Sequence, residues 1–160
     1  MNKVKVLFVC LGNICRSPLA EAIFKDKIRR RNLDHLFVVE SCGTANYHVG
    51  DTPDPRTIAN AKKNGIAIDH LGRQFTSKDF LDFDYIFVMD SSNHQNVLRL
   101  VQDPTHRDKV AMMRNFDPTA PGEDVPDPYH GTERHFQDVF DILDRSTENL
   151  LTHLEKNLQA

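Results

Sequence analysis

Cysteine is scarce in this sequence, and its three cysteines, Cys10, Cys15 and Cys42, do not resemble the disulfide framework of a secreted domain. The N-terminus also lacks an apolar signal segment with a cleavage site, and the longest apolar runs are far too short to cross a bilayer. We therefore expect a cytoplasmic protein in a reducing compartment, with no membrane association.

Charge of one sign is not in excess either, because 20 Lys and Arg residues stand against 23 Asp and Glu residues, a formal net charge of -3. This balance provides no electrostatic footprint for nucleic acid or for an anionic membrane, so we expect neither as a partner. Repeats, low-complexity tracts and interior linkers are missing as well. A chain of 160 residues without such divisions predicts one domain over residues 1–160.

Basic residues cluster at one place in the sequence, near the end of the first expected helix: Lys25, Lys27, Arg29, Arg30 and Arg31. Cations are favourable at a helix C-terminus because they complement the helix dipole. We therefore interpret the cluster as a solvated helix face rather than a ligand site.

Apolar strand patterns alternate with helical patterns along the chain. Strands are expected at residues 4–9, 37–42, 85–89 and 109–113, where β-branched and aromatic residues gather. Helices are expected after Ser17, at 57–64, in a brief turn capped by 76–79, from Ser91 or Ser92 to about residue 102, and along an apolar stripe at 136–154. This order predicts an α/β fold of three layers: a four-stranded parallel sheet with helices on both faces, and ligands at the C-terminal strand ends.

The segment between the first strand and the first helix has the pattern of a phosphate-binding loop that carries a cysteine nucleophile. Ser17 suits a helix N-cap and Pro18 a first helical residue, so free backbone N–H groups should converge in front of Cys10. Gly12 and Asn13 tolerate the positive φ angles that such an anion-binding nest needs. The segment therefore indicates a phosphatase.

The loop also supplies a cation. A helix N-terminus, inward N–H dipoles and the guanidinium of Arg16 all favour the thiolate form of Cys10. Arg16 can hold two non-bridging oxygens of a phosphoryl group in one fork. Cys10 is otherwise only a small core residue at a strand end, but the combined Gly, Asn, Arg and Ser pattern in a strand–loop–helix context favours the nucleophile.

Expulsion of an alkoxide or phenoxide is easier if a carboxylic acid protonates it, so a second segment should supply an acid. Residues 115–131 form a long connection stiffened by four prolines, and the acids in it are Asp117, Glu123, Asp124 and Asp127. Tyr129 favours Asp127, because an aromatic wall suits an aromatic leaving group. Asp90, at the end of the third expected strand, could reach the same side of the sheet, although helix capping suits it better.

Over essentially the whole chain, the sequence resembles the low-molecular-weight protein tyrosine phosphatase family. Residues 10–17 match the active-site signature of that family, and Asp127-Pro128-Tyr129 matches its general-acid loop. The resemblance implies the phosphotyrosine phosphatase I-like, Rossmann-like fold with the first strand central in the sheet. His130 departs from the mammalian pattern, in which a second tyrosine follows Tyr129.

The resemblance also implies roles for individual residues. Cys10 would be the nucleophile, Arg16 the transition-state clamp and Asp127 the proton donor. The phosphate-binding loop would comprise Leu11, Gly12, Asn13, Ile14, Cys15, Arg16 and Ser17, with loop support from Asn13, Ser17 and His70. The substrate ring would lie among Leu11, Tyr47 and Tyr129. Cys15 would be a redox partner that forms a reversible disulfide, or simply a small buried residue.

These residues predict two-step hydrolysis of phosphotyrosine in proteins, and of small aryl phosphates, through a cysteinyl-phosphate intermediate. We expect no cofactor and no metal, inorganic phosphate as product and inhibitor, and a monomer or weak dimer. An acidic pH optimum follows, because carboxyl groups lose their proton near about pH 4.

Three alternatives remain open. A thioredoxin-linked arsenate reductase of the same fold would need a further cysteine pair in mid-chain, where only Cys42 is available. A protein arginine phosphatase would have threonine in place of Ile14. A non-catalytic phosphotyrosine-binding module would lack the nucleophile, the clamp or the acid, and none of these is missing.

Overall fold

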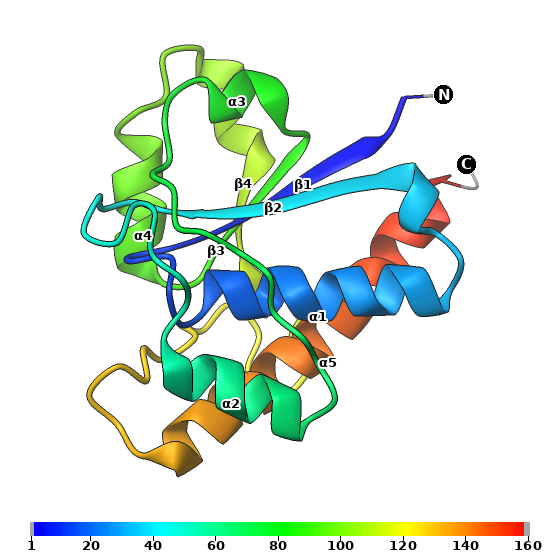
Figure 1. Ribbon diagram of the computed structural model, residues 1–160. Helices are drawn as coiled ribbons and strands as arrows, with labels where there is room; N and C mark the ends of the chain where they lie inside the picture. The colour runs from blue at the N-terminus through cyan, green and yellow to red at the C-terminus, as the bar shows by residue number, and fades with distance from the viewer. Residues whose placement is uncertain (1, 159–160) are drawn as a thin grey trace.

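Four parallel strands form the central layer of the protein in the computed structural model, which describes residues 2–158 (Figure 1). They are β1 (Val4–Cys10), β2 (Phe37–Gly43), β3 (Tyr85–Val88) and β4 (Val110–Met112). Their order is β2-β1-β3-β4, so β1 lies between two neighbours as expected. All four predicted strands are confirmed, each within two residues of the expected bounds.

Within the described residues, five α-helices cover the sheet: α1 (Ser17–Arg30), α2 (Pro55–Lys63), α3 (Asp79–Asp82), α4 (Ser91–Leu98) and α5 (Glu133–Leu158). Short 3₁₀-helices occur at Asp34–Leu36, Pro104–Lys109 and Met113–Phe116. In Figure 1, α1, α2 and α5 lie on one side of the sheet, and α3 and α4 on the other. The predicted three-layer α/β fold is confirmed. Between residues 2 and 158, none of the helices has the length and apolar character needed to span a bilayer.

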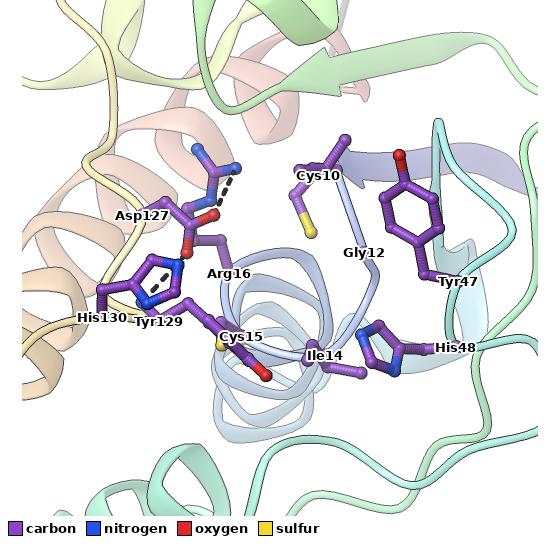
Figure 2. Close-up of a pocket in the computed structure, with 11 residues that line it drawn as sticks. Cys10, Gly12, Ile14, Cys15, Arg16, Tyr47, His48, Asp127, Tyr129 and His130 are labelled. Carbon is purple, nitrogen blue, oxygen red and sulfur yellow. Dashed lines mark hydrogen bonds and ion pairs between the residues drawn. The ribbon is translucent and has the colours of Figure 1, made fainter.

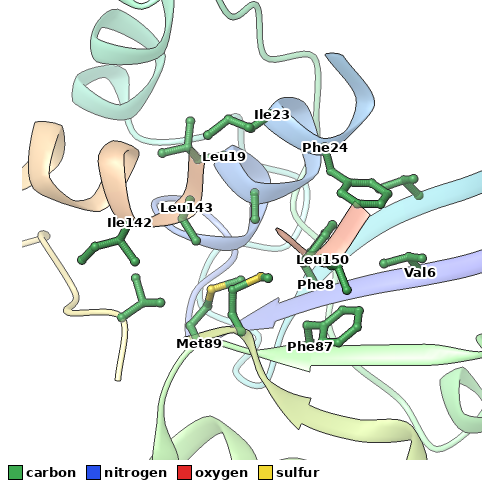
Figure 3. Packing of buried hydrophobic residues seen from close by; sticks show 14 of the residues in the cluster. Val6, Phe8, Leu19, Ile23, Phe24, Phe87, Met89, Ile142, Leu143 and Leu150 are labelled. Atoms are coloured by element: carbon green, nitrogen blue, oxygen red, sulfur yellow. The ribbon is translucent and has the colours of Figure 1, made fainter. Parts of the chain in front are cut away.

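Side chains of β1 alternate between two hydrophobic clusters. Val6 and Phe8 pack toward α1 and α5, as Figure 3 shows, whereas Leu7 and Val9 pack with residues of α3 and α4. Because the side-chain period of a strand is two, Cys10 falls on the α1 side of the sheet. Burial on both faces also explains why β1 is nearly continuous in apolar residues.

Two helix boundaries differ from the sequence-based prediction because aspartates cap these helices. The carboxylate of Asp54 accepts from the N–H of Arg56 at 2.8 Å, and α2 therefore begins at Pro55. α4 is capped by Asp90, for which the sequence favoured a capping role, and not by Ser91 or Ser92; it ends at Leu98 rather than near residue 102. The capping box expected at residues 76–79 is only half present, because Asp79 accepts from the N–H of Thr76 at 2.9 Å without a reciprocal bond.

The prediction that the basic cluster is a solvated face is wrong for two of its residues. Lys27 pairs with Asp144 at 2.8 Å and with Glu148 at 2.7 Å, while Arg31 pairs with Glu155 at 2.8 Å and also with Glu148. These acids lie on α5, more than 110 residues away in the chain. The sequence pattern of α1 alone does not reveal that α5 packs beside it.

Candidate active site

The loop that joins β1 to α1 is held by its carbonyl groups. The carbonyls of Cys10 and Leu11 accept from the N–H groups of Thr44 and Ala45 at 2.9 and 3.0 Å, and that of Ile14 accepts from Asp54 at 2.9 Å. Within residues 2–158, no N–H group from residue 11 to residue 16 donates to a protein acceptor. These six donors, next to the N-terminus of α1, are therefore available to an anion.

Asn13, and not Gly12, supplies the left-handed backbone conformation in this loop. Asn13 has a φ of 58°, whereas Gly12 is not among the residues with positive φ, so the prediction for Gly12 is wrong. Gly12 instead lies close to the side chain of His48, because an added Cβ would be 3.2 Å from its Cδ2.

Ser17 is the first residue of α1 and does not cap it, contrary to the prediction. Its hydroxyl lies 2.9 Å from Sγ of Cys10, and its N–H donates to the same sulfur at 3.4 Å. The side chain of Ser17 points toward Cys10 and not toward the free N–H groups at the start of α1. The N–H of Ser17 can stabilise negative charge on this sulfur, and so can the hydroxyl when its proton points to the sulfur rather than to the carbonyl of Cys42, which lies 3.2 Å away.

Asn13 is held in place by Ser17 and His70, as the family resemblance implies. Nδ2 of Asn13 donates to Oγ of Ser17 at 2.8 Å, and Oδ1 of Asn13 lies 2.7 Å from Nε2 of His70. The N–H of Arg73 donates to the same oxygen at 3.1 Å. The side-chain oxygen and nitrogen of Asn13, the residue of this loop in a left-handed conformation, are therefore both hydrogen-bonded.

Two further members of this network, Glu21 and Ser41, were missed by the sequence analysis. Ser41 donates to Oε1 of Glu21 at 2.6 Å, and His70 lies 3.2 Å from the same oxygen. Burial alone would raise the pKa of Glu21, but hydrogen bonds from His70, Lys25 and Ser41 hold it below its usual value. A glutamate inside the apolar stripe of α1 was the signal that could have revealed it.

Arg16 is almost completely buried, with 2% of its surface exposed. Its Nη1 donates to Oδ2 of Asp90 at 2.7 Å and to the carbonyl of Val125 at 2.9 Å. Burial alone would lower the pKa of the guanidinium, but the charges of Cys10, Asp90 and Asp127 raise it above its ordinary value. Asp90 therefore both caps α4 and anchors Arg16, a combination that the sequence analysis did not predict.

Among the four acids of the long connection, only Asp127 lines the same pocket as Cys10. Its carboxylate lies 3.7 Å from Nη2 of Arg16, accepts from the N–H of Tyr129 at 3.1 Å, and is 42% exposed. Asp117 is fully buried between Arg114 and Arg145, whereas Asp124 accepts from the N–H of Ser91.

The pocket has a volume of about 300 Å³. The three residues expected to surround a substrate ring, Leu11, Tyr47 and Tyr129, all line it. Figure 2 shows Tyr47 and His48 across the pocket from Asp127, Tyr129 and His130, with the sulfur of Cys10 between them. His48 also lines the pocket and was not predicted from the sequence, in which its adjacency to Tyr47 is the only signal.

Cys15 also lines the pocket, and its thiol lies 3.9 Å from Oδ2 of Asp54. Burial and the negative charge of Asp54 raise the pKa of Cys15 to about 12, so its thiol stays protonated at neutral pH. Cys10, Cys15 and Cys42 are all free and buried. Across the part of the chain that the structure describes, no group of three or more His, Cys, Asp or Glu side chains is placed to hold a metal ion.

The pocket thus brings together the sulfur of Cys10, the guanidinium of Arg16 and the carboxylate of Asp127 beside a loop of free N–H donors. This arrangement is that of the cysteine-dependent phosphatases. The family model for low molecular weight phosphotyrosine protein phosphatases matches residues 5–160. The chain belongs to the low molecular weight phosphotyrosine protein phosphatase family.

Individual relatives are similar over most of their length. The low molecular weight phosphotyrosine protein phosphatase from Schizosaccharomyces pombe is 45% identical, and the match covers 94% of this chain and 96% of that protein. The one from Homo sapiens is 40% identical, and the match covers 84% of this chain and 85% of that protein. Among solved structures, a protein tyrosine phosphatase from Entamoeba histolytica with Hepes in its active site matches with a TM-score of 0.93, at 41% identity and over 97% of this chain and 99% of that one. A Drosophila arginine phosphatase matches with a TM-score of 0.87 at 35% identity, and the match covers 94% of this chain and 98% of that one.

Proposed function

We propose that this protein hydrolyses phosphotyrosine in proteins, and small aryl phosphates, through a cysteinyl-phosphate intermediate. The observation that carries the proposal is the placement of Cys10, Arg16 and Asp127 around one pocket, beneath a loop with free N–H donors. An anion bound by that loop would lie directly in front of the sulfur.

In the first step, the thiolate of Cys10 attacks phosphorus, and the bond between phosphorus and the tyrosine oxygen breaks. Asp127 donates a proton to that oxygen as it leaves. In the second step, Asp127 takes a proton from water, whose oxygen attacks phosphorus and releases inorganic phosphate and the thiolate. Arg16 and the N–H groups of residues 11–16 stabilise the charge on the equatorial oxygens throughout. No metal or cofactor takes part in this scheme.

The pocket walls support an aromatic substrate, because Tyr47 and Tyr129 can contact both faces of a phenyl ring that enters between them. Similarity to an arginine phosphatase makes phosphoarginine the second candidate. Ile14, which lines the pocket, favours the phenolic ester because it is apolar and bulky. Rates on matched phosphotyrosine and phosphoarginine peptides would separate the two activities.

Several further properties belong to this proposal. We infer one catalytic domain over residues 1–160, acting in the cytoplasm as a monomer or weak dimer on phosphotyrosine proteins. Inorganic phosphate should inhibit by occupying the loop. Cys15 serves as a redox partner of Cys10, and Asn13, Ser17 and His70 support the loop.

Hydrolysis of phenyl phosphate by Asp127→Asn and Asp124→Asn variants tests the proposal. Asp127→Asn should reduce kcat by about 10²- to 10⁴-fold, the range for loss of a general acid. Asp124→Asn changes a carboxylate of the same loop that does not line the pocket, and should retain most of the activity. Near-normal turnover of Asp127→Asn would remove Asp127 from this role, and turnover by Cys10→Ser would show that the chemistry lies elsewhere.

A further inference from the structure

A second groove lies next to the catalytic pocket and shares two of its walls. Leu11 and Tyr47 line both cavities, and the groove continues to Asn96, Arg99 and Leu100 at the end of α4. Its volume is about 370 Å³. Figure 1 shows α4 beside the loop that follows β2, which carries Tyr47. A ligand seated between Leu11 and Tyr47 can therefore extend into this groove.

The groove has one charged residue among those that line it, Arg99. Nη1 of Arg99 donates to Oδ1 of Asn96 at 3.0 Å, and within residues 2–158 no carboxylate lies within ion-pair distance of its guanidinium. Other cations, such as Arg16 and Arg31, are paired with carboxylates. Arg99 thus offers an exposed positive charge that the described part of the chain does not neutralise.

We propose that this groove binds the peptide segment next to the phosphotyrosine, and that Arg99 pairs with an acidic side chain of that segment. The inference rests on the proposed phosphatase function, because the phosphotyrosine ring must first lie against Leu11 and Tyr47. A peptide advances about 3.3 Å per residue, so an acidic residue a few positions away comes within reach of α4. The planar fork of an arginine matches a carboxylate in two parallel hydrogen bonds.

The apolar part of the groove fits the same occupant. Leu11, Tyr47 and Leu100 are all exposed large hydrophobic residues, with 71% of Tyr47 exposed. Such residues can pack against the stem of a peptide side chain while Arg99 binds its charged end. A charge at the rim of a binding surface contributes mainly to specificity and association rate. Arg99 should therefore select among phosphopeptides without changing the chemical step.

The experiment measures kcat/KM on phosphotyrosine peptides in which a single Asp is moved through the positions on each side of the phosphotyrosine, against an all-Ala peptide. For the unmodified protein, Asp at one or two neighbouring positions should raise kcat/KM by about two- to fivefold, the range for an exposed ion pair. Arg99→Ala should lose this increase. Arg99→Glu should reverse it and favour Lys at the same positions.

Two controls separate the groove from other causes. Arg29→Glu makes the same charge change at an exposed site on α1 and should keep the Asp preference, which excludes a general electrostatic effect. Hydrolysis of p-nitrophenyl phosphate, which does not reach the groove, should be equal in all variants. A flat Asp scan, a preference that survives Arg99→Ala, or one that Arg29→Glu also abolishes would overturn the groove proposal. Failure to hydrolyse p-nitrophenyl phosphate would overturn the phosphatase function itself.

Discussion

Nη1 of Arg16 donates to Oδ2 of Asp90 at 2.7 Å, while Oδ1 of the same aspartate accepts from the N–H of Asn93 at 2.7 Å. One carboxylate thus caps α4 with one oxygen and orients the guanidinium of Arg16 with the other. The position of Arg16 is therefore coupled to the position of α4, although the two belong to separate parts of the chain.

Asp90→Asn should impair catalysis because it keeps a side-chain oxygen for the cap but presents no charge to Arg16. We expect kcat on p-nitrophenyl phosphate to fall on the order of 10²-fold, as for a displaced catalytic group. Asn93→Ala is the matched control, since it removes the reciprocal capping contact and leaves Asp90 in place. It should cost about 1 kcal/mol in thermal or urea unfolding with kcat retained. Full activity of Asp90→Asn would show that Arg16 is oriented without this carboxylate.

Gly43→Ala should distort the phosphate-binding loop. Gly43 is paired with Cys10 in the sheet register, and an added Cβ would lie 2.7 Å from the carbonyl of Leu11 and 3.1 Å from the nitrogen of Asn13. Backbone atoms cannot move aside as a side chain can, so we expect about 1–3 kcal/mol of destabilisation and weaker inhibition by inorganic phosphate.

Gly12→Ala offers the comparison, because its added methyl group would meet only side chains: the movable ring of His48 at 3.2 Å and, at ordinary contact distance, Ile14 at 3.7 Å. For both variants, urea unfolding measures the free energy of unfolding, and the inhibition constant for phosphate measures how tightly the loop binds the anion. An equal or larger effect at Gly12 would contradict the steric explanation for Gly43.

Asp117→Asn should weaken the fold in a pH-dependent way. Burial alone would raise the pKa of Asp117, but hydrogen bonds from Arg145, Thr119 and Arg114 outweigh burial and hold it well below its usual value of 3.8. A carboxyl group with a lowered folded-state pKa stabilises the protein fully above its unfolded-state pKa and loses this effect as the pH falls toward the folded-state value.

The difference in unfolding free energy between the unmodified protein and Asp117→Asn should therefore be about 3 kcal/mol at pH 7, the cost of breaking a buried pair, and should shrink below about pH 4. Asp138→Asn, at an exposed position of α5, is the control and should show little difference at either pH. A difference for Asp117→Asn that stays constant between pH 7 and pH 3 would refute the assignment.

Cys15→Ser should make oxidative inactivation irreversible. The thiol of Cys15 is protonated at neutral pH, so peroxide should first convert Cys10 to a sulfenic acid, with which the Cys15 thiol condenses to a disulfide and water. Dithiothreitol would reverse this disulfide. Without Cys15, Cys10 should proceed to sulfinic acid.

Residual activity after peroxide and then dithiothreitol, with mass spectrometry of the peptide that contains Cys10, measures the outcome. Cys42→Ala is the control, because Cys42 lies in β2 and does not line the pocket. It should recover activity as the unmodified protein does, and equal recovery of Cys15→Ser would exclude Cys15 as the redox partner.

The fold and the strand–loop–helix segment that contains Cys10 could be predicted from the sequence because contiguous residues determine both. The apolar run of β1, the loop from Leu11 to Arg16 and the amphipathic start of α1 follow one another, so strand, anion cradle and helix N-terminus are local features. The alternation of strands and helices then restricts the topology to a few parallel arrangements.

The long-range partners of the buried and half-buried arginines were decided by the tertiary structure alone. Arg16 meets Asp90 at a separation of 74 residues, and Arg31 meets Glu155 at a separation of 124. Composition also left four acids open in one loop, of which only Asp127 reaches the pocket. A local sequence pattern indicates which residues can form a strand, a helix or an anion-binding loop. The packing of helices onto the sheet determines which charged side chains meet across the layers.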